Sequence, residues 1–483
     1  MKKAKKRLIW IIIQILYKIN IMRILLIQAK LLPKLITINP PHGLMYISAV
    51  CKQNGYKDIK ILHLDIFDKD WKNEILKFRP DIVGIGSITA QGKSMHEIAG
   101  FVKENTKAKV IVGGAYPTYY YQDILKDKNI DICVIGEGEK TFLKIIKYYE
   151  NKTDISEIPS IAYLDKTGIK INRKKEIYDN LDELPFPDYQ SIDVYKYQKL
   201  VNSSIYTYGS KTMTIYTSRG CPFDCIFCHK VHGKSFRAHS PKRVIEEIKY
   251  LHDTYGIKAI DIMDDIANFN PARFNDILKM FKKELPQDTA LYFSGGLSAK
   301  TLTEENIEVM SQSRVKYFAI AVESGSERVQ KLIKKNLDLK KTKGLIDYAV
   351  KKGLYVHGLF MIGFPFETKK DIEQTVDFMK NSKLHTMILS TAMAYKGTEL
   401  AKMVAVSEIK NINSDRFHYS DYEGFIKSGI LSETELKKLK FKANAHFYYS
   451  PIRIFRILRS LPSKNPKLLW ILILKFLKRS IIK

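Results

Sequence analysis

The chain has little cysteine, no acidic residue near either end and no long uninterrupted apolar run. Only five of its 483 residues are cysteine, which is sparse for the disulfide framework of a secreted protein. Neither end reaches the roughly 20 continuous apolar residues that a membrane-spanning helix needs. These absences predict a protein of a reducing, cytoplasmic compartment whose contact with a membrane, if it makes one, is peripheral.

Acidic residues are missing before Asp58 and after Glu435, and these two ends carry eleven and thirteen Lys or Arg. The formal net charge of +29 therefore comes mainly from the ends, and the stretch between them is close to neutral. A near-neutral body argues against nucleic acid as a partner. The cations of residues 452–459 and 468–479 alternate with apolar side chains, a pattern typical of a helix lying on an anionic membrane.

Residues 1–21 are basic and apolar and begin like a secretory signal, but no small-residue cleavage site follows them. Met22 opens a strand-like run, so Met1 and Met22 are both candidate translation starts. Residues 1–21 are accordingly either an extension or an interfacial helix.

Three of the five cysteines, Cys221, Cys225 and Cys228, lie within eight residues, in a loop opened by Gly220 and bent by Pro222. Thiolates at this spacing can bind three irons of a cubane [4Fe–4S] cluster and leave the fourth iron without a protein ligand. Such a site is open to a small molecule.

The alternative is a zinc site completed by His229 or His232. Structural zinc is usually held by two separated pairs of ligands, and the sequence offers no second pair. The remaining cysteines, Cys51 and Cys133, are too few for a second cluster.

Residues 22–150 alternate short apolar runs with amphipathic stretches, and the runs lie at 24–27, 59–64, 82–88, 110–114 and 132–135. This alternation predicts an α/β fold, a doubly wound Rossmann-like domain with a parallel sheet. Ligands of such sheets bind at the strand carboxyl ends. The candidate binding residues there are Ser87, Thr89, Gly113, Gly114, Gly136, Glu137 and Gly138.

Residues 151–205 are polar and punctuated by Asp and Pro, which predicts a connector. In residues 206–410, strand-like runs at 213–217, 259–263, 290–294, 317–322, 355–362 and 387–393 are separated by helical segments such as 241–255 and 371–380. Six such units predict a partial (β/α)6 TIM-like barrel, with its chemistry at the strand carboxyl ends. Residues 411–483 are expected to form a small helical region that ends in the basic amphipathic tail.

The CxxxCxxC loop resembles the signature of the radical S-adenosylmethionine (SAM) enzymes. The first domain resembles the cobalamin-binding domain that precedes the radical domain in one large branch of this superfamily. This branch includes cobalamin-dependent radical methyltransferases and the anaerobic magnesium-protoporphyrin oxidative cyclase. The resemblance rests on the segments Pro40–Ala49, Pro80–Gly84, Val112–Gly114, Asp131–Thr141 and Leu181–Tyr189, in this order.

The resemblance implies roles for further residues. Asp264 and Asp265 would meet the amino group of SAM, and Ser294 and Glu323 would approach its ribose and its methionine carboxylate or amine. Phe227 would meet the adenine through its backbone. Gly363 would open an adenine-proximal turn, in which Phe366 replaces the usual glycine. Two alternatives stay open. The carboxylates of Asp264, Asp265 and Glu323 would instead form ion pairs inside the barrel rim, and Phe227 would be a packing residue.

The resemblance also implies the function. We expect an oxygen-sensitive enzyme that uses a [4Fe–4S] cluster, SAM and cobalamin to methylate an unactivated carbon, with an electron donor such as flavodoxin or ferredoxin. Radical cyclisation, oxidation or ring contraction is the alternative, and a non-catalytic, cluster-bearing membrane sensor is an alternative of another class. The sequence identifies no catalytic side chain. It leaves the substrate open, although the basic amphipathic ends would suit a lipid.

The Asp-x-His-x-x-Gly stretch, through which a histidine replaces the lower axial base in other cobalamin-binding domains, is missing after the first predicted strand. The resemblance therefore implies cobalamin without a histidine ligand. His42 lies in a Pro-rich stretch and is expected to be a surface or packing residue.

Overall fold

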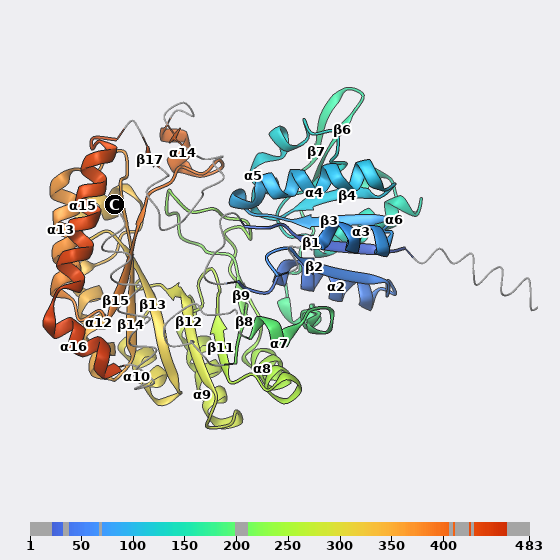
Figure 1. Cartoon of the computed structure of the whole chain (residues 1–483). Coiled ribbons are helices and arrows are strands. Elements are labelled where there is room, and N and C mark those ends of the chain that lie inside the picture. Colours follow the sequence, from blue (N-terminus) through green and yellow to red (C-terminus); the bar gives the residue numbers. More distant parts are fainter. Residues whose placement is uncertain are drawn as a thin grey trace, which may run out of the picture. The chain divides into compact units, whose positions relative to one another are not determined.

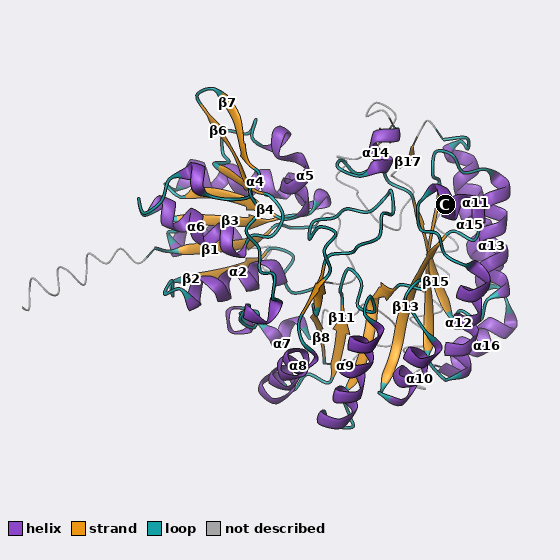
Figure 2. Cartoon of the chain, turned by 180° about the vertical axis from the view of Figure 1, so that it is seen from behind, coloured by secondary structure: helices purple, strands orange, loops and turns teal. Residues whose placement is uncertain are grey.

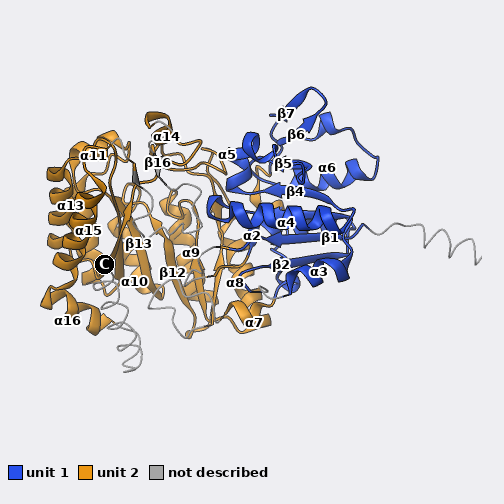
Figure 3. Cartoon of the chain, turned by 45° about the horizontal axis from the view of Figure 1, so that its top comes forward, with its two compact units in different colours: residues 1–30, 41–177, 184–192 blue, residues 31–40, 178–183, 193–483 orange. Residues whose placement is uncertain are grey.

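The computed structural model describes residues 22–31, 38–66, 70–198, 211–404, 409–410, 425–426 and 429–460. The chain divides into two compact units (Figures 1 and 3), of which unit 1 comprises residues 1–30, 41–177 and 184–192 and unit 2 the remainder. The helices predicted for 1–21 and for the last part of the basic tail, 461–483, lie outside the described residues.

Unit 1 is built on a seven-stranded sheet in the order β2-β1-β3-β4-β5-β6-β7. Its strands are β1 (Ile24–Gln28), β2 (Ile59–His63), β3 (Ile82–Gly86), β4 (Lys109–Gly113), β5 (Ile132–Val134), β6 (Ile161–Asp165) and β7 (Gly168–Asn172). The first five are parallel, and the order reverses beside β1, which confirms the predicted doubly wound sheet. The connecting helices are α2 (His42–Gln53), α3 (Trp71–Phe78), α4 (Gly92–Asn105), α5 (Ala115–Ile124) and α6 (Glu139–Tyr149).

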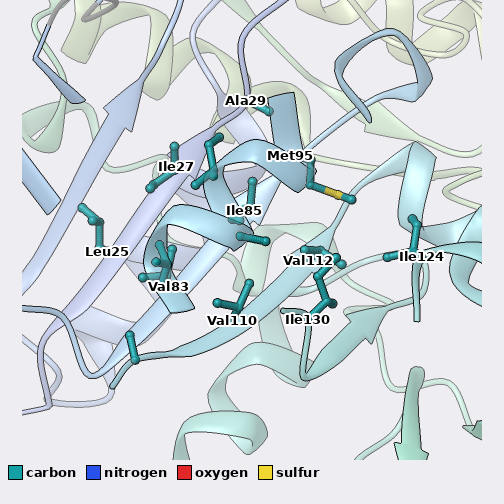
Figure 4. Close-up of a cluster of buried hydrophobic side chains, with 14 of the residues drawn as sticks. Leu25, Ile27, Ala29, Val83, Ile85, Met95, Val110, Val112, Ile124 and Ile130 are labelled. Carbon is teal, nitrogen blue, oxygen red and sulfur yellow. The ribbon is translucent and has the colours of Figure 1, made fainter. Parts of the chain in front are cut away.

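The core of unit 1 lies between the sheet and the helices that follow its central strands. Alternate residues of β1, β3 and β4 form one apolar layer with Met95 and Ile124 (Figure 4). Residues between them, such as Leu26 and Ile82, are also fully buried. Burial on both faces is why these strands read as continuous apolar runs rather than as alternating patterns.

The stretch expected to be a connector partly belongs to unit 1. Residues 161–172 form the antiparallel β6–β7 hairpin, which extends the sheet beyond β5. Asp188 accepts a hydrogen bond from the Ser48 hydroxyl at 2.5 Å and forms an ion pair with Lys52 at 2.6 Å. The polar composition suggested a linker because only Ile161 and Ala162, at the start of β6, are fully buried in the hairpin, so it lacks the apolar runs of the central strands.

Unit 2 contains an open six-stranded parallel sheet in the order β15-β14-β13-β12-β11-β8, which confirms the partial barrel. The strands are β8 (Thr212–Ile215), β11 (Ala259–Ile262), β12 (Ala290–Leu297), β13 (Val315–Glu323), β14 (Tyr355–Ile362) and β15 (Thr386–Thr391). The helices outside them (Figure 2) are α8 (Pro241–Tyr255), α9 (Pro271–Glu284), α10 (Glu304–Gln312), α11 (Glu327–Leu332), α12 (Leu339–Lys351) and α13 (Lys369–Asn381).

Further elements belong to unit 2. They are α7 (Val194–Tyr197), β9 (Ser218–Arg219), β10 (Arg237–Ala238), α14 (Glu399–Met403), β16 (Ile409–Lys410), β17 (Phe425–Ile426), α15 (Glu433–Tyr448) and α16 (Pro451–Ser460). None of the helices in the described ranges has the length and apolarity that a membrane span requires.

Candidate functional site

Asp264 holds the turn that leads from β8 into the cysteine loop. Its carboxylate accepts hydrogen bonds from the backbone amide of Thr217 at 2.5 Å, from the Thr217 hydroxyl at 2.6 Å and from the Ser218 hydroxyl at 2.6 Å. Asp264 is only 4% exposed. Burial raises its pKa, and the hydrogen bonds from Ser218 and Thr217 oppose that rise. Both carboxylate oxygens are thus engaged inside the barrel, so these contacts favour a positioning role over the expected contact with an amino group.

Asp265 lies differently, because its side chain is largely exposed at the rim. One oxygen, Oδ2, accepts the backbone amide of Gly220 at 2.9 Å and lies 2.9 Å from Nδ1 of His232. Gly220 is required there: its φ is +83°, and a Cβ would lie 2.2 Å from the carbonyl oxygen of Ser235. Asp265 therefore fixes the entry to the cysteine loop with Oδ2, whereas its Oδ1 accepts no hydrogen bond from the described residues.

The three cysteines occupy graded environments in the loop that follows. Cys225 is buried, Cys221 is half-buried and Cys228 is exposed. The loop is anchored through Ile226, whose amide donates to the carbonyl of Ile333 at 3.2 Å. The hydrogen bond between the thiols of Cys225 and Cys228 lowers the pKa of Cys225 and raises the pKa of Cys228. Burial raises the pKa of Cys221 as well. Cys225 is thus the thiol of the three that most readily becomes a thiolate, the form that binds metal.

The two histidines of the zinc alternative are engaged elsewhere. Nε2 of His229 lies 3.0 Å from the carbonyl oxygen of Lys396, and His232 pairs with Asp265. Within the described ranges, no three His, Cys, Asp or Glu side chains converge as a single metal ion would require. A cubane cluster places each thiolate on a separate iron, so it has no need of such convergence.

Lys335, which the sequence did not single out, lies beside the cysteine loop. Its ammonium donates to Oε1 of Glu323 at 3.2 Å. Burial disfavours its charge, but Glu323 and the thiols of Cys225 and Cys228 outweigh burial and raise the pKa of Lys335. A fixed positive charge here would stabilise an anionic cluster. No motif marks this lysine; it reaches the site through the turn after α11.

Glu323 ends β13 in a strained conformation, with a φ of +67° that non-glycine residues rarely adopt. Gln330 holds this turn, because its side-chain amide donates to the carbonyls of Val322 at 2.8 Å and Ser324 at 2.6 Å. Gly325 packs so closely on α13 that a Cβ would lie 2.7 Å from its backbone. The surrounding structure thus imposes the strain that directs Glu323 toward Lys335.

Ser294 lies in an irregular stretch of β12, where the pairing with β13 shifts between Phe293 and Leu297. Its amide donates to Oδ1 of Asp261 at 2.9 Å. Its hydroxyl oxygen is buried and has no hydrogen-bond partner among the described residues. A bulge with an unpaired buried hydroxyl at a strand carboxyl end suits a polar ligand group.

Gly363 opens the turn after β14, with a φ of +87°. Its amide and that of Phe364 donate to Oε2 of Glu367 at 2.6 and 3.3 Å. The other oxygen of Glu367 is buried without a partner among the described residues, and burial raises the pKa of this carboxyl to about 8. Phe366, at the position where glycine is usual, has no positive φ. The side chain of Phe366 is therefore accommodated without backbone strain.

Phe227 belongs to an aromatic group at this turn. Its ring centroid lies 5.8 Å from that of Phe364, which in turn stacks on Phe366 at 5.7 Å. These contacts account for the side chain of Phe227 by packing, and they leave its backbone, the part expected to meet adenine, in the cysteine loop.

The glycine segments of unit 1 meet at the carboxyl edge of β3, β4 and β5. The amide of Ser87 donates to the carbonyl of Gly113 at 3.0 Å, and the hydroxyl of Thr118 links the carbonyl of Gly114 to the amide of Gly136. Gly114 has a φ of +103°, and a Cβ would lie 2.5 Å from the carbonyl oxygen of Ser87. The edge is thus a continuous, side-chain-poor cradle, which fits a large flat ligand.

The remaining candidates of unit 1 surround this cradle. Thr89 begins a short 3-10 helix after β3, and Glu137 and Gly138 are half-buried before α6. His42 is the first residue of α2 and is buried, so it packs inside the unit instead of lying on the surface.

Comparison with known proteins identifies both units. The B12 binding domain family matches residues 34–146, and the Radical SAM superfamily matches residues 215–379. Two relatives match along most of their length, each at 29% identity. An uncharacterized methyltransferase of Pyrococcus horikoshii aligns over 86% of this chain and 89% of its own. The cytidylyl-2-hydroxyethylphosphonate methyltransferase of Streptomyces wedmorensis aligns over 84% and 86%.

A third relative, the anaerobic magnesium-protoporphyrin IX monomethyl ester cyclase of a Synechocystis strain, is 27% identical over 61% of this chain and 59% of its own. Among solved structures, the radical SAM methyltransferase TsrM of Kitasatospora setae, with cobalamin and a [4Fe–4S] cluster bound, covers 90% of each chain. It has a TM-score of 0.70 and 14% identity, so it shows a shared fold.

A radical SAM domain uses a [4Fe–4S] cluster and SAM, and a B12-binding domain uses cobalamin. The residues described above fit these groups. Three cysteines beside a buried ammonium suit an anionic cluster, the unpaired hydroxyl of Ser294 suits a polar group of SAM, and the glycine cradle suits a corrin ring.

Proposed function

We propose that this chain, in which a B12-binding domain precedes a radical SAM domain, is an enzyme that methylates an unactivated carbon of its substrate. The observation that carries the proposal is that the special residues of each unit lie toward the carboxyl ends of its parallel strands. In unit 2 these are the cysteine loop, Asp265, Glu323 with its partner Lys335, and Ser294 in the irregular carboxyl half of β12; in unit 1 they are the residues of the glycine cradle. Two relatives that align with this chain over most of their length are named methyltransferases, which supports methyl transfer.

The chain's own residues take distinct roles in this proposal. Cys221, Cys225 and Cys228 hold the cluster, and Lys335 balances its negative charge. Asp265 offers its Oδ1 to the ammonium group of SAM, where a charge-assisted hydrogen bond is strong. Asp264 is a positioning residue, because its bonds to Thr217 and Ser218 fix the start of the loop that Asp265 then holds at Gly220.

The bound cofactors supply the reactive chemistry, a hydrogen-abstracting adenosyl radical and a transferable methyl group. The protein's part is to orient SAM, to hold cobalamin at the cradle of Ser87, Gly113, Gly114, Gly136 and Gly138, and to exclude water. No side chain of the chain is assigned as an acid or a base.

The experiment that tests the proposal follows both products of SAM. Reconstituted enzyme is incubated without oxygen with cobalamin, a low-potential reductant, methyl-deuterated SAM and candidate substrate extracts. Methyl transfer yields S-adenosylhomocysteine together with 5′-deoxyadenosine, and deuterium appears in the product. A cyclase or oxidase yields 5′-deoxyadenosine without S-adenosylhomocysteine, and a sensor yields neither. Absence of labelled product with sustained 5′-deoxyadenosine formation would refute methyl transfer and favour the cyclase alternative.

The site assignment has its own test, which separates the two aspartates. Asp265→Asn should weaken SAM binding by about 10- to 150-fold, the effect of losing one charge-assisted contact worth roughly 1.5–3 kcal/mol. Asp264→Asn should mainly lower the thermal unfolding midpoint, because it disturbs a buried network. The measurements are calorimetric SAM titration and circular dichroism of both variants, each loaded with cluster. Equal SAM affinities of the Asp265→Asn variant and the wild type would return Asp265 to a structural role.

The substrate is a small molecule, and we propose a lipid-like one because of the basic amphipathic ends. We also propose that a flavodoxin or ferredoxin delivers the electron and that the enzyme works at the inner face of the cytoplasmic membrane. Product analysis with fractionated lipid and water-soluble extracts separates the two substrate classes.

A further inference from the structure

The last described helix, α16, has its polar and apolar faces reversed relative to an ordinary surface helix. The residues that pack on the protein include Arg453, only 4% exposed, and Arg456, which is half-buried. The residues that face outward are apolar except for Arg459: Ile452 is 73% exposed and Phe455 66% exposed, with Leu458 and Ile454 beside them at 45% and 42%. A surface helix normally buries its apolar face and exposes its charges.

Arg453 fixes this orientation. Its guanidinium donates to the carbonyl of Leu384 at 2.5 Å, to those of Met379 and Lys380 at 3.1 Å each, and to that of Ser382 at 3.3 Å. These carbonyls lie at and just beyond the C-terminal end of α13, where a positive charge is favoured. The guanidinium also lies 3.6 Å from the ring centroid of Phe447. Rotating α16 to bury its apolar face would break all these contacts.

We infer that the outward face of α16 is a docking surface for an anionic lipid bilayer. Clustered exposed apolar side chains mark interaction sites. A helix with such a face and nearby cations fits the boundary between headgroups and acyl chains. Arg459 lies on the outward side of α16, and the sequence from 461 to 483 adds six Lys or Arg and no acid.

Charge distinguishes an anionic bilayer from the two other candidates for covering this apolar face, which are the chain's own segment 461–483 and a second copy of α16. The chain's own segment 461–483 is apolar enough to cover α16, but it would bring six further cations against a helix that already carries three arginines. A second copy of α16 would bring three more. Neither occupant supplies a compensating negative charge, whereas an anionic bilayer does, at up to about 1 kcal/mol for each cation near its surface.

The docking surface lies at the opposite end of unit 2 from the cofactor residues. α16 contacts Leu384 and His385, which precede the start of β15, and Nε2 of His385 lies 3.0 Å from the hydroxyl of Ser460. The cluster and SAM candidates all follow strand carboxyl ends. Bilayer contact through α16 therefore leaves the site uncovered. The inference deepens the proposed membrane location, and it does not depend on methyl transfer.

The test uses full-length protein and two kinds of vesicle, one of phosphatidylcholine alone and one with phosphatidylglycerol added. The variant carries Ile452→Gln with Phe455→Gln, which removes the two most exposed side chains without touching Arg453. The matched control is Leu164→Gln, the same change at a 54% exposed leucine of β6. A second pair, Ile454→Gln with Leu458→Gln, repeats the test on the same face.

Co-sedimentation should show wild type and the Leu164→Gln control bound to the anionic vesicles and weakly bound to phosphatidylcholine. Both α16 variants should partition at least about 10-fold more weakly, which corresponds to about 1.4 kcal/mol. Binding should also weaken as salt rises, because salt screens exposed charge. Circular dichroism and light scattering in the absence of lipid should give the same unfolding midpoint and the same mass for all four proteins.

Each of the following outcomes would overturn the inference. Equal vesicle binding of the wild type and both α16 variants, or no binding of the wild type, would remove the bilayer as the occupant. A dimer in the wild type that becomes a monomer in the α16 variants would assign the face to a second copy of the chain. If the α16 variants unfolded earlier than the Leu164→Gln control, the face would instead be covered by the chain's own tail.

Discussion

Glu367 gives the sharpest prediction, because its carboxyl is fully buried with only one oxygen engaged. Oε2 accepts the amides of Gly363 and Phe364, whereas Oε1 has no partner among the described residues. Burial raises the pKa of this carboxyl from 4.5 to about 8. The perturbation is Glu367→Gln, which keeps an oxygen acceptor for both amides and removes the ionisation.

The sign of the pH dependence follows from the raised pKa. Below pH 4.5 the carboxyl is protonated in both the folded and the unfolded chain, so its contribution to the unfolding free energy is fully present. Between pH 4.5 and about 8 the unfolded chain releases the proton and the folded chain retains it, so stability falls by about 1.4 kcal/mol per pH unit. Over this window the loss reaches roughly 3–5 kcal/mol. The Gln variant lacks it and should gain relative to the wild type as pH rises.

The assay is urea denaturation of cluster-loaded protein without SAM, followed by circular dichroism at several pH values between 5 and about 9. The difference in unfolding free energy between the Gln variant and wild type is the quantity of interest, because all other titrating groups cancel. Asp371→Asn provides a control of opposite sign in the same turn. Its carboxylate has a lowered pKa, because hydrogen bonds from Arg328, Ser326 and Thr368 outweigh its burial. The stability lost in the Asn variant should therefore be largest at neutral pH and fade in acid.

A difference between Glu367→Gln and wild type that stays within about 1 kcal/mol across the whole pH range would refute the reasoning. It would mean that the buried oxygen finds a partner, such as water, that holds the carboxyl near its ordinary pKa.

Four further predictions concern the cofactor residues and the end of the chain. A chemical iron assay should find about four irons per reconstituted wild-type chain, and Cys225→Ala should abolish this cluster. Iron retained by the variant, or stoichiometric zinc in the wild type, would contradict the cluster assignment. Gly114→Ala should weaken cobalamin binding in absorbance titrations and cost roughly 1–3 kcal/mol of stability, because its φ and the oxygen of Ser87 leave no room for Cβ. Paramagnetic resonance of the cob(II)alamin form should lack nitrogen hyperfine splitting, and a splitting removed by His42→Ala would show a histidine ligand. Arg453→Ala should lower the unfolding free energy by about 3 kcal/mol or more, because several buried carbonyls lose a charged donor; a change below about 1 kcal/mol would mean that α16 is held by other contacts.

The contacts of Arg453 also determine where the tail can be removed without disturbing the described structure. Truncation after Ser450 takes away α16 and with it Arg453, so it would disturb the end of α13 as well as any membrane contact. A deletion that begins after Ser460 removes only residues outside the described part of the chain.

The amino-acid sequence alone was enough to predict the fold class of both units and to locate the loop with three closely spaced cysteines. Strands buried on both faces produce continuous apolar runs, and helices between them produce amphipathic ones, so the two parallel sheets were predictable. The cysteine spacing is local, within eight residues, and a loop of that length keeps its thiols together whatever surrounds it. The rule that parallel sheets bind ligands at strand carboxyl ends then located the glycine cradle.

Only the tertiary structure decided which side chains of those segments are open to a ligand and which are engaged. Asp264 and Asp265 are adjacent in sequence, yet one is enclosed by Thr217 and Ser218 and the other faces the rim. Lys335 reaches the cysteine loop through a turn that no motif marks, and Arg453 turns the apolar face of α16 outward. The physical reason is the same in each case. Such contacts join residues far apart in the chain, and their free energy depends on burial and hydrogen-bond geometry, which a pattern of residue types does not specify.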